Sequence, residues 1–356
     1  MSKPTHLHFD DMSSSLQTFP CQTKQEANNA EAETNPELYQ HFASLISSLP
    51  NTRGVASQLY RHEQGWHGNM PAMVGAMVAD ACFAARPSDI IVATMPKSGT
   101  TWIKSLLYAT VHRGEHRPDA DDHPFHSVGP HHCIKFLEYQ LYTHNMIPNL
   151  DRLPDPRFFS THLPFVALPR TIMSTSCKIV YVCRDPKDTF VSLWDFLNKF
   201  RVRDGLDPLS AESAVELFCD GLLPFGPYWD HVLGYWRAHL AHPEQVLFFR
   251  YEEMQRDPAA HVRRLAEFVG VPFGAGEEEE EDGVVAAIVK LCSFEHMNGL
   301  KATKDGTSET VLGTMKNSWF FRRGVVGDWE NHLSPEAARR VDAITEARFK
   351  GSGLDV

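Results

Sequence analysis

The chain has 356 residues, of which 42% are hydrophobic and 22% charged, the composition of an ordinary folded protein rather than a disordered one. Its net charge of −11 argues against broad non-specific binding to nucleic acid or to an anionic membrane surface, so a bound polyanion needs a local basic cluster. Seven cysteines without a C-x-x-C pair, no visible signal or transit peptide, and no apolar run of the roughly 20 residues that a membrane span needs favour a cytoplasmic location.

The N-terminal part of the sequence is polar and gives way to short helical patterns. Residues 1–37 are rich in Asn, Glu, Gln, Ser and Thr and are expected to form a mobile leader. Apolar periodicity predicts helices over Leu38–Leu49 and Met73–Ala85, with a turn-rich segment at Gln58–Asn69 between them. Further along, the acidic run Glu277–Asp282 is most simply a solvated loop.

Four short segments have the character of strands in a buried parallel sheet. They are Ile90–Thr94, Arg157–His162, Lys178–Cys183 and Val246–Arg250. Short, largely apolar strands are typical of a sheet that helices cover on both faces. The sequence therefore predicts an α/β protein with a central, mainly parallel β-sheet flanked by helices, and ligand groups at the carboxyl ends of the strands. We assign residues 1–50 to the flexible leader with its short helix and residues 51–356 to a single domain.

The strand Ile90–Thr94 runs into Met95-Pro96-Lys97-Ser98-Gly99-Thr100-Thr101-Trp102, a small-residue turn that opens a helix. The backbone N–H groups of such a turn and the helix dipole favour an anion, and a lysine and three hydroxyls add to this preference. In the usual nucleoside-triphosphate loop the lysine follows the last glycine, but here Lys97 precedes Gly99, and no upstream glycine has the required spacing. The loop is P-loop-like, and an ordinary ATPase or GTPase is disfavoured.

Two later segments supply further positive charge. After Lys178–Cys183 the chain reads R-D-P-K-D-T-F-V-S, which places Arg184 and Ser192 about two helical turns apart if Pro186 opens the helix. Standing alone, Arg184 would more simply pair with a neighbouring aspartate. Near the C-terminus, Phe320–Trp329 joins Arg322 and Arg323 to Gly324 in a loop that can fold over an anion.

Taken in order, P-K-S-G-T-T-W, Y-V-C-R-D-P-K-D-x-x-V-S and R-R-G-x-x-G-D-W resemble the signature regions of the cytosolic sulfotransferases, and the long leader resembles their plant branch. The resemblance runs from about residue 90 to residue 333. It implies a sulfotransferase that takes its sulfuryl group from 3′-phosphoadenosine-5′-phosphosulfate (PAPS), releases adenosine 3′,5′-bisphosphate (PAP), and needs no metal.

The resemblance also assigns roles to individual residues. It implies a 5′-phosphosulfate site at Lys97, Ser98, Gly99, Thr100, Thr101 and Trp102, and a 3′-phosphate site at Arg184, Ser192, Arg322, Arg323 and Gly324. Trp102, Tyr251 and Phe294 would frame the adenine, although spacing alone favours a place in the core for these aromatic side chains.

An acceptor hydroxyl must lose its proton as it attacks sulfur, and a neutral imidazole suits that task near pH 7. Among 19 histidines the resemblance selects His162, in the T-H-L-P segment that follows a strand, as the general base. It makes Lys97 the cation for the leaving oxygen and Ser192 a residue that restrains Lys97 until the acceptor binds. The lysine that mammalian relatives have two residues before the histidine is replaced by Ser160, as is common in the plant branch.

The histidines His123, His126, His131 and His132 match no closed zinc pattern and are expected near the acceptor pocket instead. Weak candidates for the lining of that pocket are His132, Phe136 and Tyr142. Residues 111–142 and 204–225 carry no family motif, and the side chains that line the acceptor pocket are expected to come from these two segments. Phenolic or flavonoid compounds, steroid-like or hormone alcohols and desulfo-type thiohydroximates all stay open as acceptors, with hydroxylated aromatic or hormone-like molecules favoured.

Two other classes of function stay open at this point: a non-catalytic protein that only binds PAPS or PAP, and a small-molecule kinase. A monomer is favoured, because the family dimer motif K-x-x-x-T-V-x-x-x-E is degraded: Glu330 replaces the lysine and Ser334-Pro335 replaces T-V. Nucleic acid and membranes are not expected as partners.

Overall fold

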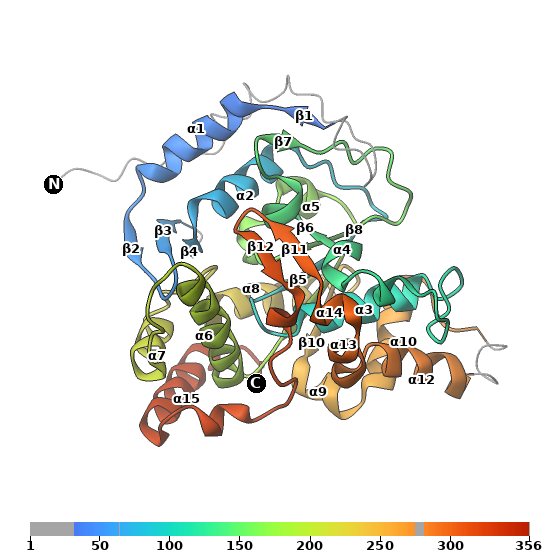
Figure 1. Ribbon diagram of the computed structural model, residues 1–356. Coiled ribbons are helices and arrows are strands. Elements are labelled where there is room, and N and C mark those ends of the chain that lie inside the picture. Colours follow the sequence, from blue (N-terminus) through green and yellow to red (C-terminus); the bar gives the residue numbers. More distant parts are fainter. Residues whose placement is uncertain (1–31, 64, 275–280, 356) are drawn as a thin grey trace.

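The computed structural model describes residues 32–63, 65–274 and 281–355 (Figure 1). Its centre is a five-stranded sheet in the order β10-β9-β5-β8-β6, in which every neighbouring pair is parallel. The strands are β5 (Ile90–Thr94), β6 (Lys135–Phe136), β8 (Phe158–Thr161), β9 (Lys178–Cys183) and β10 (Val246–Arg250). The α/β class, the parallel sheet and the four predicted strands are confirmed, and β6 is an additional short edge strand.

Helices cover both faces of this sheet, because alternate strand residues are apolar on both sides. Ile91 and Ala93 of β5 belong to one core cluster, while Ile90 and Val92 belong to the other. The first cluster includes side chains of α1 (Pro36–Ser47), α2 (Met70–Cys82), α6 (Pro186–Arg203), α7 (Ala211–Cys219), α8 (Tyr228–Ala241) and α15 (Pro335–Phe349). The second includes side chains of α3 (Thr100–Val111), α9 (Tyr251–Arg256), α10 (Pro258–Phe268), α12 (Glu281–Leu291) and α13 (Phe294–Gly299).

The N-terminal segments differ from the sequence-based expectation. The segment expected to be turn-rich instead forms the strands β3 (Gln58–His62) and β4 (Gly65–Gly68), which join β2 (Asn51–Arg53) in a small antiparallel sheet. The predicted first helix is α1, whose Phe42 and Ile46 are buried in the core against α2. Before it, β1 (Glu33–Thr34) pairs with β7 (Met146–Ile147). Residues 1–31 of the predicted leader lie outside the described residues, and its division from the domain at residue 50 stays a prediction.

The remaining elements are short and mostly connect the layers. A hairpin of β11 (Thr307–Thr310) and β12 (Gly313–Lys316) lies across the middle of the molecule in Figure 1. Short helices are η3 (Pro124–His126), α4 (Pro130–Cys133), η4 (Leu137–Leu141), η5 (Phe165–Ala167), α5 (Arg170–Ser174), α14 (Lys301–Lys304), η6 (Asn317–Phe320) and η7 (Asp328–Asn331). Most of the acidic run lies outside the described residues, and its last two residues begin α12. No helix in the described parts of the chain has the length and apolar character needed to cross a membrane.

Candidate active site

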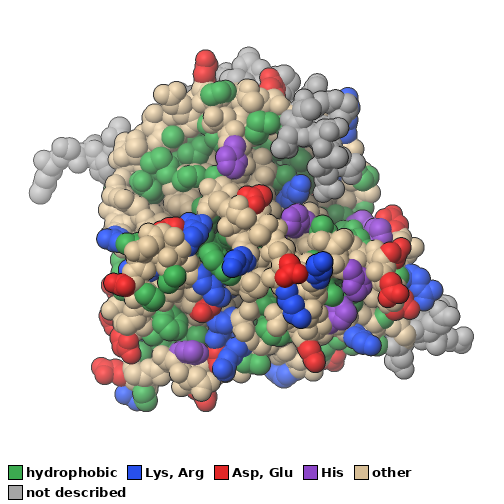
Figure 2. All heavy atoms as spheres, in the orientation of Figure 1, with side chains coloured by type: hydrophobic (Ala, Val, Ile, Leu, Met, Phe, Trp, Pro, Cys, Tyr) green, Lys and Arg blue, Asp and Glu red, His purple; other side chains and the backbone are tan. Residues whose placement is uncertain are grey.

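The parallel order of the sheet brings the segments that follow three of its strands to one edge. Strand β5 lies between β8 and β9, so the chain leaving β5 toward Lys97 is flanked by His162 after β8 and by Arg184 after β9. A cavity of about 610 Å³ opens there. Of the residues predicted for the site, those that line it are His162, Lys97, Gly99, Thr100, Thr101, Trp102, Arg184, Ser192, Tyr251, Phe294, Arg322, Arg323 and Gly324. Figure 2 shows Lys and Arg side chains gathered in the middle of this face, although the chain as a whole is acidic.

The turn after β5 leaves the N-terminus of α3 open toward the cavity. Gly99 precedes the helix with φ 103°, and no side chain caps the first turn. A Cβ atom at Gly99 would lie 2.8 Å from Cδ2 of Tyr251, so both the backbone conformation and the space require glycine here. Ser98 is the one predicted site residue that does not line the cavity, and its buried Oγ lies 3.3 Å from Oγ1 of Thr189. The unpaired N–H groups of the first turn suit an anion.

Lys97 projects into the same cavity from a backbone with φ 72°. Its Nζ lies 4.3 Å from the ring centroid of Phe196 and 5.8 Å from that of Phe320. Burial, assisted by the positive charge of Lys199, lowers the pKa of Lys97 to about 7. A bound anion would therefore favour the charged form. Ser192 lines the same cavity, but the structure has no hydrogen bond between its hydroxyl and Lys97.

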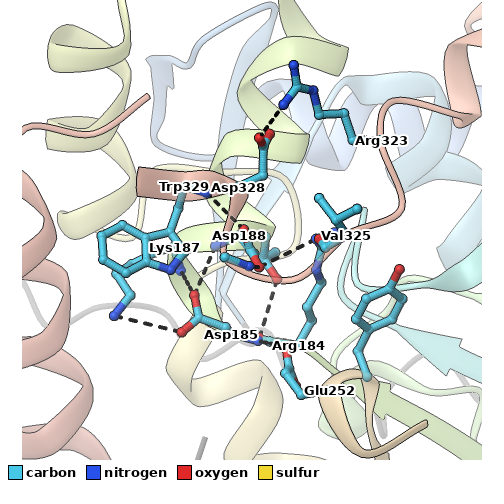
Figure 3. Close-up of polar contacts among 12 residues, drawn as sticks. Arg184, Asp185, Lys187, Asp188, Glu252, Arg323, Val325, Asp328 and Trp329 are labelled. Atoms are coloured by element: carbon cyan, nitrogen blue, oxygen red, sulfur yellow. Dashed lines mark hydrogen bonds and ion pairs between the residues drawn. The ribbon is translucent and has the colours of Figure 1, made fainter. Parts of the chain in front are cut away.

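Asp188, in the first turn of α6, fixes the segment that carries the paired arginines (Figure 3). Its carboxylate accepts hydrogen bonds from the backbone N–H groups of Gly327 at 2.7 Å and Trp329 at 3.1 Å. Arg184 Nη2 lies 3.6 Å from the same carboxylate and donates to the carbonyl of Val325 at 2.8 Å. These contacts hold the motif around Arg184 against the motif that contains Arg322 and Arg323. The sequence suggested an ion pair between Arg184 and a neighbouring aspartate, and in the structure this pair, with Asp188, is buried.

The paired arginines hold a second buried carboxylate. Arg322 forms an ion pair with Asp328, and Arg323 Nη1 donates to it at 2.9 Å. Burial alone would raise the pKa of Asp328, but the hydrogen bonds from Arg322 and Asn331 and the charge of Arg323 lower it to about 2. Asp328 is therefore ionised and takes part of the hydrogen-bonding capacity of both arginines.

Two guanidinium nitrogens at the cavity still lack a partner. The Nε atoms of Arg184 and Arg322 are buried without a hydrogen bond to any described residue. A buried N–H that is unsatisfied in a positively charged pocket is an observation that fits an anionic ligand. Beside it, Gly324 has φ 67°, and a Cβ there would lie 2.3 Å from Cδ2 of Phe294, so the loop lies directly against that ring. The residues present therefore fit a nucleotide with a second phosphate.

The three aromatic residues expected around an adenine are found at the cavity wall. The rings of Trp102 and Tyr251 meet edge to face with centroids 5.4 Å apart, and the guanidinium carbon of Arg184 lies 4.6 Å from the Tyr251 centroid. Tyr251 begins α9, directly after β10. Phe294 begins α13 and contacts the Gly324 backbone. All three rings line the cavity.

His162 is the first residue after β8, and three backbone or side-chain contacts fix it. Its Nδ1 lies 2.8 Å from the carbonyl oxygen of Thr94, its N–H donates to Glu138 Oε1 at 2.7 Å, and its carbonyl accepts from His231 Nε2 at 3.0 Å. A carbonyl only accepts, so Nδ1 carries the proton and Nε2 keeps its lone pair. Nε2 has no hydrogen-bond partner in the part of the chain that the structure describes. Burial lowers the pKa of His162 to about 3, so the ring is neutral near pH 7.

A family model described as the sulfotransferase domain matches residues 87–353. The chain belongs to the sulfotransferase family. Cytosolic sulfotransferase 17 of Arabidopsis thaliana is 41% identical over 337 residues, covering 92% of this chain and 95% of that protein. Cytosolic sulfotransferase 16 of the same plant is 42% identical over 328 residues, with 91% and 94% covered. The plant-type sulfotransferase predicted from the motifs is therefore confirmed.

Solved structures agree with this assignment. An Arabidopsis thaliana sulphotransferase structure is similar with a TM-score of 0.70 and 35% identity, covering 94% of this chain and 99% of that one. A mouse sulfotransferase complexed with PAP has a TM-score of 0.61 and 28% identity, covering 83% and 96%. This sulfotransferase has the fold that its motifs implied.

The side chains that line the rest of the cavity are mostly apolar, and only some of the segments that supply them were predicted from the sequence. Of the weak candidates, Phe136 lines it, whereas His132 and Tyr142 are not among the described residues at its wall. Tyr139 comes from one of the two segments expected to line the pocket, and residues that were missed include Phe196, Phe200, Ser57, Asn69, Val311, Leu312 and Met315. Together, these side chains come from η4, α6, the small N-terminal sheet region and the β11–β12 hairpin. The aromatic side of α6, at residues four apart, was the one signal in the sequence that could have pointed to this wall.

Of the histidines in the run, His131 lines the cavity, whereas His123, His126 and His132 are not among the described residues at its wall. His123 precedes η3, and His131 lies in α4 at the cavity wall. The described residues include no group of three or more side chains placed to hold a metal ion. Both ring nitrogens of His131 are engaged, Nε2 with Thr101 Oγ1 at 3.0 Å and Nδ1 with Lys104 Nζ at 3.2 Å. His131 therefore has no free lone pair with which to act as a base.

Proposed function

We propose that this sulfotransferase transfers the sulfuryl group of PAPS to a hydroxyl of a small aromatic or hormone-like acceptor, with His162 as general base. The observation that carries the proposal is that the His162 ring, with Nε2 unengaged among the described residues, lies on the same cavity as the anion-binding turn. The mouse relative that binds PAP supports the choice of donor.

The donor would lie between the turn after β5 and the loop of the paired arginines. The first turn of α3, with Lys97, Thr100 and Thr101, would hold its 5′ end. Arg184 and Arg322, each with an unpartnered Nε, would hold the 3′-phosphate, with Ser192, Arg323 and the backbone of Gly324 beside them. Trp102, Tyr251 and Phe294 would enclose the adenine.

His162 would take the proton of the acceptor hydroxyl at Nε2. The carbonyl of Thr94 accepts from Nδ1, so it holds the ring in the tautomer that can accept this proton and stabilises the imidazolium that results. Lys97 would stabilise the negative charge that develops on the leaving oxygen. Bound PAPS supplies the sulfuryl group, which passes in line to the acceptor oxygen as PAP leaves. Burial and the positive charges of Lys104 and Lys97 lower the pKa of His162 to about 3. The negative charge of a bound donor would oppose the effect of both lysines on this pKa.

The acceptor would occupy the aromatic part of the cavity. Phe136, Tyr139 and Phe225 surround His162, with ring centroids 4.6, 6.1 and 5.9 Å from the imidazole. Phe196 and Phe200 of α6 add two more rings at the wall. Aromatic walls with few polar groups favour a flat, hydroxylated apolar compound over a charged one.

The same proposal includes no metal requirement, because lysine and arginine side chains provide the positive charge that a metal ion provides in kinases. The names of the plant relatives support a cytosolic location. The degraded dimer motif supports a monomer.

The test is transfer of ³⁵S-labelled sulfate from PAPS to a panel of phenols, flavonoids, steroids and hydroxylated hormones. Wild type should label at least one acceptor, and His162→Asn should lose activity by roughly 10²- to 10⁴-fold while it still binds PAP. His242→Asn, an exposed histidine remote from the cavity, is the matched control and should keep full activity. PAP binding without any labelled product would favour a non-catalytic binder. Tight ATP binding with no PAP binding would favour a kinase.

A further inference from the structure

A buried cation without a counter-ion lies directly behind the donor site. Lys104, in the second turn of α3, is fully buried. Its Nζ donates to the carbonyl of Ile134 at 2.9 Å, lies 3.2 Å from Nδ1 of His131, and is 3.4 Å from the ring centroid of Phe136. No carboxylate of the described residues is within ion-pairing distance of it. The buried Glu138 acts on Lys104 electrostatically but forms no ion pair with it, so a buried ammonium here is unfavourable unless an anion arrives.

His131 connects this cation to the donor-binding turn. When Lys104 is protonated its ammonium only donates, so Nδ1 of His131 then accepts from it, and the ring proton is on Nε2. Nε2 lies 3.0 Å from Oγ1 of Thr101 and donates to it. The ring is held in place between Phe136 and Phe320, with centroids 5.7 and 4.2 Å away. The geometry is therefore a chain of donors, from Lys104 through His131 to the hydroxyl of Thr101.

The end of the chain faces the cavity. Thr101 lies in the first turn of α3 and lines the cavity, and its Oγ1 makes no other hydrogen bond with the described residues. Since Oγ1 accepts from His131, its own proton is available to a ligand. The neighbouring Thr100 differs, because its hydroxyl is paired with Thr94 Oγ1 at 2.6 Å.

We propose that Lys104 and His131 act as a buried positioning pair for the donor: Lys104 takes the anionic 5′ end of the nucleotide as its counter-charge, and His131 turns the hydroxyl of Thr101 toward that end. The inference rests on the proposed function, because it takes PAPS or PAP as the ligand. It adds two residues behind the loop that do not touch the reacting atoms and act through Thr101.

Proton uptake on binding follows from the burial of the pair. Burial lowers the pKa of Lys104 and that of His131, and a bound dianion reverses part of this effect. The other titratable groups that act on the pair are Glu138, Cys133, Lys97, His162 and His132. Binding of PAP should therefore take up protons above neutral pH, and Lys97 should account for the remainder when Lys104 is removed.

Calorimetric titration with PAP in two buffers of different ionisation enthalpy tests the proposal. Lys104→Met should bind PAP at least about tenfold more weakly and take up fewer protons than wild type. Adenosine 3′-monophosphate, which lacks the 5′-phosphate, should bind wild type and Lys104→Met with nearly equal affinity. Lys301→Met, which removes an exposed lysine of α14, is the control and should match wild type with both ligands.

A double-mutant cycle tests the route through Thr101 with smaller changes. Thr101→Val and His131→Phe should each weaken PAP binding. The double variant should bind PAP with about the same affinity as the single variant that binds it less tightly. His131→Gln, which keeps an N–H donor, should recover most of the loss. Additive effects, or a Lys104→Met protein with the proton uptake of wild type, would overturn the inference. Failure of wild type itself to bind PAP would instead remove the proposed function.

Discussion

Replacing Gly324 by alanine gives a sharp test of how the donor pocket is built. Gly324 has φ 67°, and an added Cβ would lie 2.3 Å from Cδ2 of Phe294. The left-handed backbone costs alanine about 1–2 kcal/mol, and an ordinary carbon contact needs roughly 1 Å more than the space provides. Phe294 or the loop must therefore move, and both line the cavity.

Gly327 supplies the matched control within the same loop. It also has a left-handed backbone, with φ 84°, but a Cβ there would meet no heavy atom within 4 Å. Both alanine variants share the backbone penalty, and thermal unfolding should show a further loss of stability for Gly324→Ala, because Phe294 or the loop must move. Only Gly324→Ala displaces the aromatic wall, and its PAP affinity should fall at least about tenfold, or 1.4 kcal/mol, below that of Gly327→Ala. Equal PAP affinities in calorimetry would refute the assignment of Phe294 and Gly324 to the nucleotide site.

Three further outcomes are expected from the charges and buried groups. Arg322→Ala should lose more PAP affinity than Arg323→Ala, because the Arg322 side chain is 13% exposed and has a buried free Nε, whereas Arg323 is 60% exposed; the difference should vanish for adenosine 5′-monophosphate. Chelation of divalent metals should leave sulfate transfer unchanged, and loss of labelled product with EDTA would contradict the metal-free scheme. Burial lowers the pKa of His67 from 6.5 to about 3, so protonation of His67 favours the unfolded chain. Its contribution to the free energy of unfolding is therefore complete above about pH 6.5 and is lost as the pH falls toward 3. Urea unfolding of His67→Phe should depend less on pH in that window, by at most about 1.4 kcal/mol per pH unit, and an unchanged slope would count against a buried neutral ring.

The sheet and the donor loop could be predicted from sequence because their signals are local. Strands β5, β9 and β10 have the predicted bounds, since each is a short apolar run that contributes side chains to both core clusters. Helix α6 begins at Pro186 as expected, with the Asp185 side chain accepting from the N–H groups of Lys187 and Asp188. The parallel order then places the first two motifs and the T-H-L-P segment at one edge, whereas the loop of the paired arginines follows no strand of this sheet and is held there by Asp188.

The acceptor wall was harder to predict because it depends on packing between distant segments. The region expected to be turn-rich forms β3 and β4, which pair with each other and with β2, and its Tyr60, His62 and Trp66 gave no clean alternation. Among the long-range contacts of the β11–β12 hairpin at the site is a hydrogen bond from the Val311 N–H to the carbonyl of Tyr139 at 2.9 Å. No spacing rule in the sequence connects these two positions.

The charges of the site explain how an acidic protein can be ready for a nucleotide with two anionic ends. At the proposed 3′-phosphate site, Asp188 and Asp328 hold Arg184, Arg322 and Arg323 in place, so the arginines are neutralised in part and ordered before a ligand binds. At the proposed 5′ site, no carboxylate of the described residues pairs with Lys97, and burial lowers its pKa instead. The two ends therefore respond differently to a bound nucleotide: the first exchanges hydrogen bonds within an existing network, and the second gains protons. A sulfotransferase needs its greatest gain in positive charge where the leaving oxygen becomes negative, and that is the end where the structure keeps its lysine unpaired.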